Sequence, residues 1–338
     1  MSDTPFNIVV LDDFEQLAES VPAYERLKAR ARVTILRERL DTPAKLEQKL
    51  GDADCILLMR ERTRLGEKEL TSVPRLKFIA QTGRTSAHLD LPTATRRGIA
   101  VAGTPSDTGT STKELTVGLI LGLLRKIPQV DRYMREEIWP AIAGQLLEGK
   151  TVGILGFGRI GKEVAAIMKV FNTRVLAYSR TLTAAKAAES GAERVSMETL
   201  LRESDIVTIH IPLNQNTRGI IGEKELAMMK AGALLINTAR GPLVSEQALI
   251  GALQTGHLGG AALDVFDIEP LPMDHPLRRF DNVILLSHRG YATIEVLRER
   301  YEQAMENILS FLDGKQLQLM NPDVAAASKR QSKSDRQE

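Results

Sequence analysis

Three glycines constrain the fold of this chain most strongly. They occur in the run Gly156-Phe157-Gly158-Arg159-Ile160-Gly161, between the apolar stretch 151–155 and a helical pattern. Glycines at this spacing permit a tight turn, let a pyrophosphate approach the backbone, and let helix and strand pack closely. The helix N-terminus then offers unpaired N–H groups to the phosphates. The run predicts a dinucleotide-binding unit, with the cofactor contacted by Gly156, Gly158, Arg159, Ile160 and Gly161.

The stretch 175–181, VLAYSRT, indicates which dinucleotide this unit binds. Ser179 lies 18 residues after Gly161, about where an acid usually accepts hydrogen bonds from the ribose hydroxyls of NAD. A serine can bond a 2′-phosphate without repelling it, and Arg180 can pair with that phosphate through two parallel N–H bonds. The stretch favours NADP(H). NAD(H), bound through Ser179 and the backbone beside a solvated Arg180, stays an alternative.

Two alternations of short apolar strands with helices organise the chain. The strands of the second alternation are almost continuously apolar, as parallel strands covered by helices on both faces must be. We expect an α/β protein with two Rossmann-like, doubly wound parallel-sheet domains and a cleft between them. The substrate domain is expected from residues 1–103 and 292–322, and the dinucleotide domain from 104–291. The tail 323–338 has little to bury and is expected to be disordered.

Composition limits the partners. The 45 basic residues nearly cancel the 43 acidic residues, so neither nucleic acid nor a membrane is an expected partner. The single cysteine, Cys55, and an N-terminus without a signal-peptide pattern favour a cytoplasmic protein. The apolar run 115–124 is too short to span a bilayer. The helix expected over 111–126, followed by an arm that contains Trp139, predicts a homodimer.

Three polar residues follow the predicted strands, where ligands bind in open α/β sheets. They are Arg240 in INTARGPLVSEQAL, Glu269 in ALDVFDIEPLPMDHPL, and His288 in NVILLSHRGYAT. Together with the glycine run, these segments resemble the D-isomer-specific 2-hydroxyacid dehydrogenases, from about residue 50 to residue 293. The resemblance implies hydride transfer between a nicotinamide and a small 2-oxo or 2-hydroxy acid.

The chemistry of that reaction explains the residue types. Reduction of a 2-oxo acid needs a hydride, a proton for the developing alkoxide, and a cation for the carboxylate and carbonyl oxygens. His288 would deliver the proton, and the Glu269 carboxylate would favour the imidazolium and fix its orientation. Arg240 would hold the substrate in a planar fork.

The resemblance implies further contacts. Backbone N–H groups of Thr82, Gly83 and Arg84 would bind the substrate carboxylate, and Asp264 would contact the nicotinamide carboxamide. His210 would line the cofactor site, although a role in the packed core fits it equally well. Its spacing from His88, His257 and His275 suggests no metal site. The remaining expected cofactor contacts are Pro212, Thr217, Thr238, Ala239 and Gly290.

Three functions stay open. The leading hypothesis is an NADP-preferring reductase of glyoxylate or hydroxypyruvate. The second is D-3-phosphoglycerate dehydrogenase, for which Arg60, Arg62 and Arg84 would bind a substrate phosphate, unless they are solvated loop arginines. The third is a cofactor-sensing protein like the transcriptional co-repressors that reuse this fold.

The sequence also departs from the family pattern. Ser287 stands where the family commonly has proline, and Arg289 follows the histidine, so the rigidity of this loop and the charge of the substrate pocket can differ. We expect no third domain of the kind that senses serine in longer phosphoglycerate dehydrogenases. The two chain crossings near 103–105 and 291–293 predict a hinge that closes on the substrate.

Overall fold

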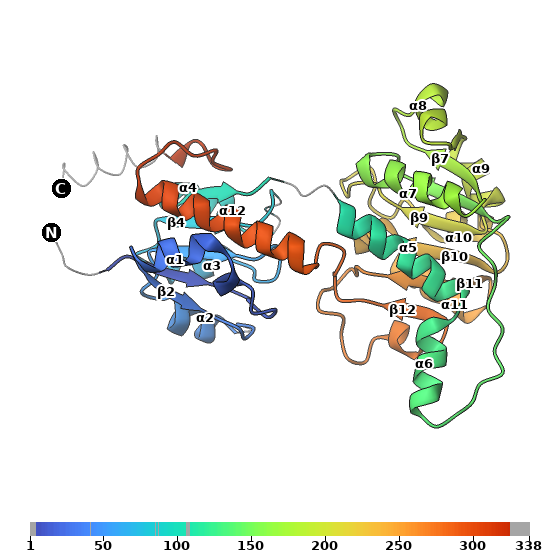
Figure 1. Cartoon of the computed structure of the whole chain (residues 1–338), viewed down its shortest axis with the longest axis horizontal. Coiled ribbons are helices and arrows are strands. Elements are labelled where there is room, and N and C mark those ends of the chain that lie inside the picture. The colour runs from blue at the N-terminus through green and yellow to red at the C-terminus, as the bar shows by residue number, and fades with distance from the viewer. Residues whose placement is uncertain (1–4, 41, 85, 87, 106–108, 325–338) are drawn as a thin grey trace. The chain divides into compact units, whose positions relative to one another are not determined.

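The chain divides into two compact units. The first combines residues 1–107 with 293–338, and the second comprises 108–292. Each unit contains one parallel β-sheet with helices packed on it (Figure 1), which confirms the expected α/β class. From residue 325 onward, the tail that we expected to be disordered lies outside the described residues. The residues that the computed structural model describes are 5–40, 42–84, 86, 88–105 and 109–324.

The first unit is built on a five-stranded sheet in the order β2-β1-β3-β4-β5, in which every pair of neighbours is parallel. The residues of β3 and β4 are all buried, as their continuous apolar runs predict. The chain adds β2 on one side of β1 and then β3 on the other, so the switch point lies between β1 and β3, and ligands bind at the carboxyl ends of strands at such a point. The strands are β1 (Asn7–Val10), β2 (Arg32–Ile35), β3 (Cys55–Leu58), β4 (Phe78–Gln81) and β5 (Ala100–Gly103).

Helices of the first unit begin where the sequence provides caps. Thr42 and Asp90 accept N–H groups of the first turns of α2 and α4, and a proline follows each cap. The last long helix returns to this sheet, because Phe311 stacks on Phe78 of β4 with ring centroids 4.5 Å apart. The helices are η1 (Ala18–Ser20), α1 (Pro22–Lys28), α2 (Pro43–Leu50), α3 (Glu67–Thr71), α4 (Leu91–Arg96) and α12 (Ile294–Leu312).

The second unit contains a seven-stranded parallel sheet in the order β12-β11-β10-β9-β6-β7-β8. From β6 the chain proceeds to β7 and β8 on one side and then returns to β9 on the other. The switch point therefore lies between β6 and β9. The strands are β6 (Thr151–Leu155), β7 (Arg174–Tyr178), β8 (Glu193–Arg194), β9 (Ile206–Ile209), β10 (Ala233–Asn237), β11 (Leu258–Leu263) and β12 (Val283–Leu285).

Each face of this sheet has its own apolar core. Side chains of α5, α7 and α8 join one core, and those of α9, α10 and α11 join the other. No described helix is both long and apolar enough to cross a bilayer. The helices are α5 (Thr110–Leu124), α6 (Ile127–Arg135), α7 (Arg159–Val170), α8 (Ala184–Glu189), α9 (Met197–Glu203), α10 (Glu223–Met228), η2 (Gly241–Leu243), α11 (Glu246–Gln254) and η3 (Pro276–Arg279).

The elements that sequence reasoning missed include α6, which was expected to be an arm, and two short ones, β8 and α9. Both residues of β8 are exposed and charged, so the strand has no hydrophobic period to reveal it. Helix α9 has a readable start, because Ser196 accepts the Thr199 N–H. Its seven residues nevertheless contain too few turns for a clear apolar stripe.

Candidate active site

The glycine run forms the turn between β6 and α7, and its three glycines differ in their surroundings. Gly156 has φ of +103°, and a Cβ there would lie 2.5 Å from the carbonyl carbon of His210. A Cβ on Gly161 would lie 2.2 Å from the Gly156 oxygen. A Cβ on Gly158 would meet nothing within 4 Å. The first and third glycines thus permit close packing, and the second faces open space.

This arrangement fits a dinucleotide. The twelve-residue α7 begins directly after Gly158, which has no side chain to cap the first N–H groups. A pyrophosphate over Gly158 would accept those N–H groups at the positive end of the helix dipole. The turn also lies at the switch point of the sheet, because Gly156 packs against His210 at the end of β9.

Ser179 and Arg180 directly follow β7, the strand next to β6. Ser179 is half-buried, whereas the Arg180 and Arg159 side chains are exposed. The Ser179 carbonyl accepts the Leu182 N–H at 3.1 Å, which fixes a turn here. Ser179 would therefore offer a hydroxyl, and Arg180 a solvent-exposed guanidinium, to the adenosine ribose.

His210 lies at the end of β9 and carries a neutral ring. Burial lowers its pKa to about 4, and its Nε2 lies 3.0 Å from Thr208 Oγ1. Two further expected cofactor residues meet in the following loop, where Thr217 Oγ1 donates to the Pro212 carbonyl at 2.7 Å. His210 therefore both packs in the protein and borders the glycine turn, so the two roles considered for it are compatible.

The structure brings Glu269 and His288 together. Glu269 Oε2 lies 2.8 Å from His288 Nδ1, and Glu269 Oε1 accepts the Phe266 N–H at 3.0 Å. His288 has φ of +57°, a left-handed conformation that is unusual for a residue with a side chain. The imidazole is held at Nδ1 and its side chain is 22% exposed, so Nε2 can reach a substrate.

The carboxylate of Glu269 stays charged at this position. Burial is the largest single effect and opposes its ionisation, but the hydrogen bond and charge of His288, the Phe266 N–H and the Arg240 guanidinium together outweigh it. The net result is a pKa below the usual range for glutamate. A charged Glu269 can therefore orient the His288 ring through its Nδ1 atom.

Arg240 follows β10, and Asn237 shapes its loop. The Asn237 amide donates to the Arg240 carbonyl at 2.9 Å and accepts the Ala239 N–H at 3.0 Å. The Arg240 guanidinium donates to the Ala239 carbonyl at 2.7 Å, and Thr238 Oγ1 lies 3.1 Å from Thr116 Oγ1 of α5. Sequence reasoning missed Asn237, although an asparagine at the end of an apolar strand is a signal for a bonded turn.

Asp264 organises the loop that carries the histidine. Its carboxylate accepts the Arg289 N–H at 2.6 Å and the Gly290 N–H at 2.7 Å, and its carbonyl accepts the His288 N–H at 2.8 Å. Burial raises the pKa of Asp264, and the two N–H groups oppose that rise. Hydroxyls of α5 complete the support, because Ser111 donates to the Gly290 carbonyl at 2.8 Å. No sequence pattern indicated this positioning role of Asp264.

In the first unit, the backbone of the expected substrate residues is partly engaged. The Thr82 N–H donates to the Leu58 carbonyl at 2.9 Å, and the Gly83 N–H donates to Thr104 Oγ1 at 2.7 Å. These two amides are therefore used within the protein. Arg84 is exposed. The Arg60 guanidinium packs on Gly83, because a Cβ there would lie 2.5 Å from its Nη1.

The remaining histidines serve other contacts. His275 Nε2 lies 3.0 Å from Glu246 Oε1, and His257 Nε2 lies 3.0 Å from the Leu226 carbonyl. His88 is buried in the first unit. Within the described ranges, no three His, Cys, Asp or Glu side chains are grouped so as to hold a metal ion.

The sequence model of the D-isomer specific 2-hydroxyacid dehydrogenase NAD-binding domain matches residues 117–290. A glyoxylate reductase of Aeropyrum pernix is 40% identical over 308 residues, which cover 87% of this chain and 84% of that protein. A D-3-phosphoglycerate dehydrogenase of Archaeoglobus fulgidus is 37% identical over 241 residues, covering 71% of this chain and 46% of that protein. The solved phosphoglycerate oxidoreductase of Vibrio cholerae superimposes with a TM-score of 0.86 at 30% identity, covering 91% and 99%.

A glycine turn fitted to a dinucleotide, with an Arg, Glu and His at the carboxyl ends of neighbouring strands, defines a nicotinamide-dependent oxidoreductase. The chain belongs to the D-isomer-specific 2-hydroxyacid dehydrogenases, which act on the CH–OH group of 2-hydroxy acids.

Proposed function

We propose that the protein reduces small, unphosphorylated 2-oxo acids such as glyoxylate or hydroxypyruvate. The observation that carries this proposal is the 2.8 Å contact between His288 and Glu269, which supplies an oriented acid. Its support among relatives is the glyoxylate reductase at 40% identity. Initial rates with a panel of phosphorylated and unphosphorylated 2-oxo acids test it, and a clear preference for phosphohydroxypyruvate would refute it.

In the proposed mechanism, a nicotinamide cofactor held at the glycine turn of Gly156, Gly158 and Gly161 would supply a hydride to the substrate C2 carbon. Arg240 would bind the substrate carboxylate and carbonyl oxygens, Arg60 would contribute further positive charge, and the Arg84 N–H would offer a hydrogen bond. His288 Nε2 then donates a proton to the developing alkoxide, while the Glu269 carboxylate stabilises the imidazolium. Asp264 holds the loop through backbone N–H groups, so its contribution is positioning.

We propose that NADP(H) is preferred to NAD(H). Ser179 and the exposed Arg180 directly follow β7, and neither would repel a 2′-phosphate. An acid at this edge would accept the ribose hydroxyls of NAD(H) and repel that phosphate. The ratio of kcat/KM for the two reduced cofactors tests this choice.

D-3-phosphoglycerate dehydrogenase is the second candidate, supported by relatives such as the one from Archaeoglobus fulgidus. It requires a cationic site for the substrate phosphate, for which Arg60, Arg62 and Arg84 were considered. Arg62 already makes two bonds to the Glu15 carboxylate, which weakens this candidate. A cofactor-sensing co-repressor would bind the dinucleotide without turnover, so the same rate measurements would distinguish it from an enzyme.

We also propose a cytoplasmic homodimer. The segment from α6 to Leu146 exposes large apolar side chains, with Trp139 86% exposed, Leu146 74% and Ile138 48%. Apolar side chains gathered along one segment favour association with a second chain. Light scattering at micromolar concentration should give twice the chain mass, and Trp139→Ser should shift the molecule toward one chain mass. A wild type with one chain mass would contradict the dimer.

A further inference from the structure

We propose that Arg62 is a positioning residue that, through its ion pair with Glu15, holds the turn carrying Arg60, and that this use keeps it from binding a substrate phosphate. The inference rests on the proposed function, because Arg60 is the proposed substrate contact. It assigns Glu15 and Arg62 a role in selecting unphosphorylated substrates.

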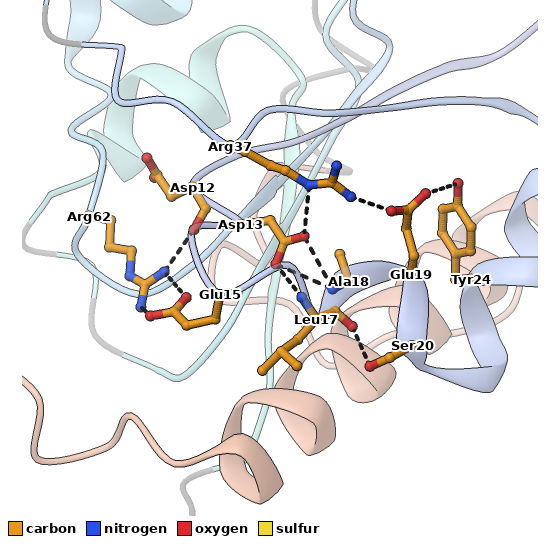
Figure 2. Close-up of polar contacts among 10 residues, drawn as sticks. All are labelled: Asp12, Asp13, Glu15, Leu17, Ala18, Glu19, Ser20, Tyr24, Arg37 and Arg62. Carbon is orange, nitrogen blue, oxygen red and sulfur yellow. Dashed lines mark hydrogen bonds and ion pairs between the residues drawn. The ribbon is translucent and has the colours of Figure 1, made fainter.

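The contacts of Arg62 join two loops at the carboxyl edge of the first sheet. Its Nη1 and Nη2 donate to the two carboxylate oxygens of Glu15, each at 2.8 Å, and Nη1 also donates to the Asp12 carbonyl at 2.7 Å. Figure 2 shows the Arg62 guanidinium facing both the Asp12 carbonyl and the Glu15 carboxylate. Glu15 and Asp12 follow β1, whereas Arg62 follows β3, the neighbouring strand. The ion pair therefore ties together two strand ends.

The low solvent exposure of both side chains strengthens this ion pair. The side chains of Arg62 and Glu15 are only 9% and 19% exposed, and the guanidinium lies 5.1 Å from the centre of the Phe14 ring. A bidentate pair with little access to water is stronger and better oriented than a solvated one. A second tie lies beside it, where Thr63 Oγ1 donates to Asp12 Oδ2 at 2.8 Å.

Both joined loops contain left-handed residues with side chains. Asp12 has φ of +60° and Arg60 has φ of +54°. Such conformations persist only when the surroundings hold them, and they concentrate at functional sites. Burial raises the pKa of Asp12, against the opposing effects of Thr63 and Arg62, so the buried carboxyl depends on these partners.

Arg60 is fixed from both sides of this turn. Its N–H donates to Thr82 Oγ1 at 2.8 Å, and the Arg62 N–H closes the turn on the Met59 carbonyl at 3.3 Å. The Arg60 guanidinium then packs on Gly83, where any side chain would collide with it. Release of Arg62 would free one end of the turn and let the Arg60 guanidinium leave that position.

The experiment compares Glu15→Gln, Arg62→Gln and the double variant with the wild type. The control is Arg26→Gln, elsewhere in the first unit. It removes an ion pair with Glu306 that also has two hydrogen bonds but is exposed to solvent. The measurements are KM and kcat for an unphosphorylated and a phosphorylated 2-oxo acid, KM for the reduced cofactor, and amide hydrogen exchange of residues 59–63.

We expect each single variant to raise KM for the unphosphorylated acid by about five- to tenfold, or roughly 1 to 1.4 kcal/mol. The cofactor KM and the kcat at saturation should change by less than about twofold, and exchange in 59–63 should accelerate. Because the two residues act as one pair, the double variant should be no worse than either single variant. The control should match the wild type in every measurement.

Two results would overturn the inference. One is unchanged exchange in 59–63 together with an unchanged KM in Glu15→Gln, the more conservative variant. The other is a selective loss of the phosphorylated substrate in Arg62→Gln, which would make Arg62 a phosphate ligand. A wild type that reduces no 2-oxo acid would instead refute the proposed function, and the exchange data would still show whether the ion pair holds the turn.

Discussion

Glu269 Oε2 and His288 Nδ1 are 2.8 Å apart, and the histidine backbone is held in a left-handed conformation with φ of +57°. The pair joins the loop after β11 to the loop after β12. It fixes Nδ1 as the ring nitrogen that faces Glu269, and in the proposed mechanism Nε2 is the proton donor.

Glu269→Gln should weaken the acid. The wild-type carboxylate, with a lowered pKa, stays charged as the pH falls through the weakly acidic range, and it presents a negative charge to the His288 ring there. The amide cannot do so, and we expect kcat for reduction to fall at least about tenfold at neutral pH. The variant should also lack the part of the acid-side fall in kcat that comes from protonation of Glu269. A pH profile of the same shape as that of the wild type would contradict this role.

Asp264→Asn should loosen the histidine loop. The carboxylate accepts the N–H groups of Arg289 and Gly290, and an asparagine has only one acceptor oxygen to offer them. The lost bond is worth about 1 to 3 kcal/mol at a buried site. We expect faster amide exchange at residues 289–290 and a lower kcat. Unchanged exchange at these two amides would show that the loop is held by other contacts.

Arg180→Ala should remove most of the preference for NADPH. The guanidinium is exposed beside β7, so its loss should cost little stability. We expect kcat/KM with NADPH to fall at least about tenfold, or roughly 1.4 kcal/mol, with little change for NADH. The control variant is Lys186→Ala in the following helix α8, which also removes one positive charge. A wild type that prefers NADH by tenfold would refute the NADP proposal.

His210→Asn should flatten the acid dependence of stability. The folded histidine has a pKa of about 4, below the ordinary 6.5, so the unfolded chain binds more protons between these values. The wild type therefore loses stability as the pH falls from 6.5 toward 4, by about 2 kcal/mol from this residue. Urea unfolding at pH 7 and pH 4.5 should show a smaller drop in the variant. Equal drops would remove His210 as the cause.

The fold was readable from sequence because its signals are local. The apolar strands of both sheets are continuous runs, and the glycines at 156, 158 and 161 require particular backbone and packing conditions. The segments that contain Arg240, Glu269 and His288 could also be identified from the sequence, because the resemblance to the family covers them.

The supporting contacts could not be read in the same way. The bonds from Asp264 to the amides of 289 and 290 and the pairing of Glu15 with Arg62 join segments 25 and 47 residues apart. Their partners are backbone groups or ordinary charged residues, which have no distinctive sequence pattern. Only the tertiary structure showed that Arg62, considered for a substrate phosphate, is bonded to Glu15.

The most direct test of the central claim is the initial rate of NADPH oxidation with glyoxylate and hydroxypyruvate, measured for the wild type and His288→Ala. The account predicts turnover by the wild type and a loss of kcat of at least about a hundredfold in the variant, with the cofactor dissociation constant nearly unchanged. Near-normal kcat in His288→Ala, or no turnover of any 2-oxo acid by a folded wild type that binds the cofactor, would contradict it.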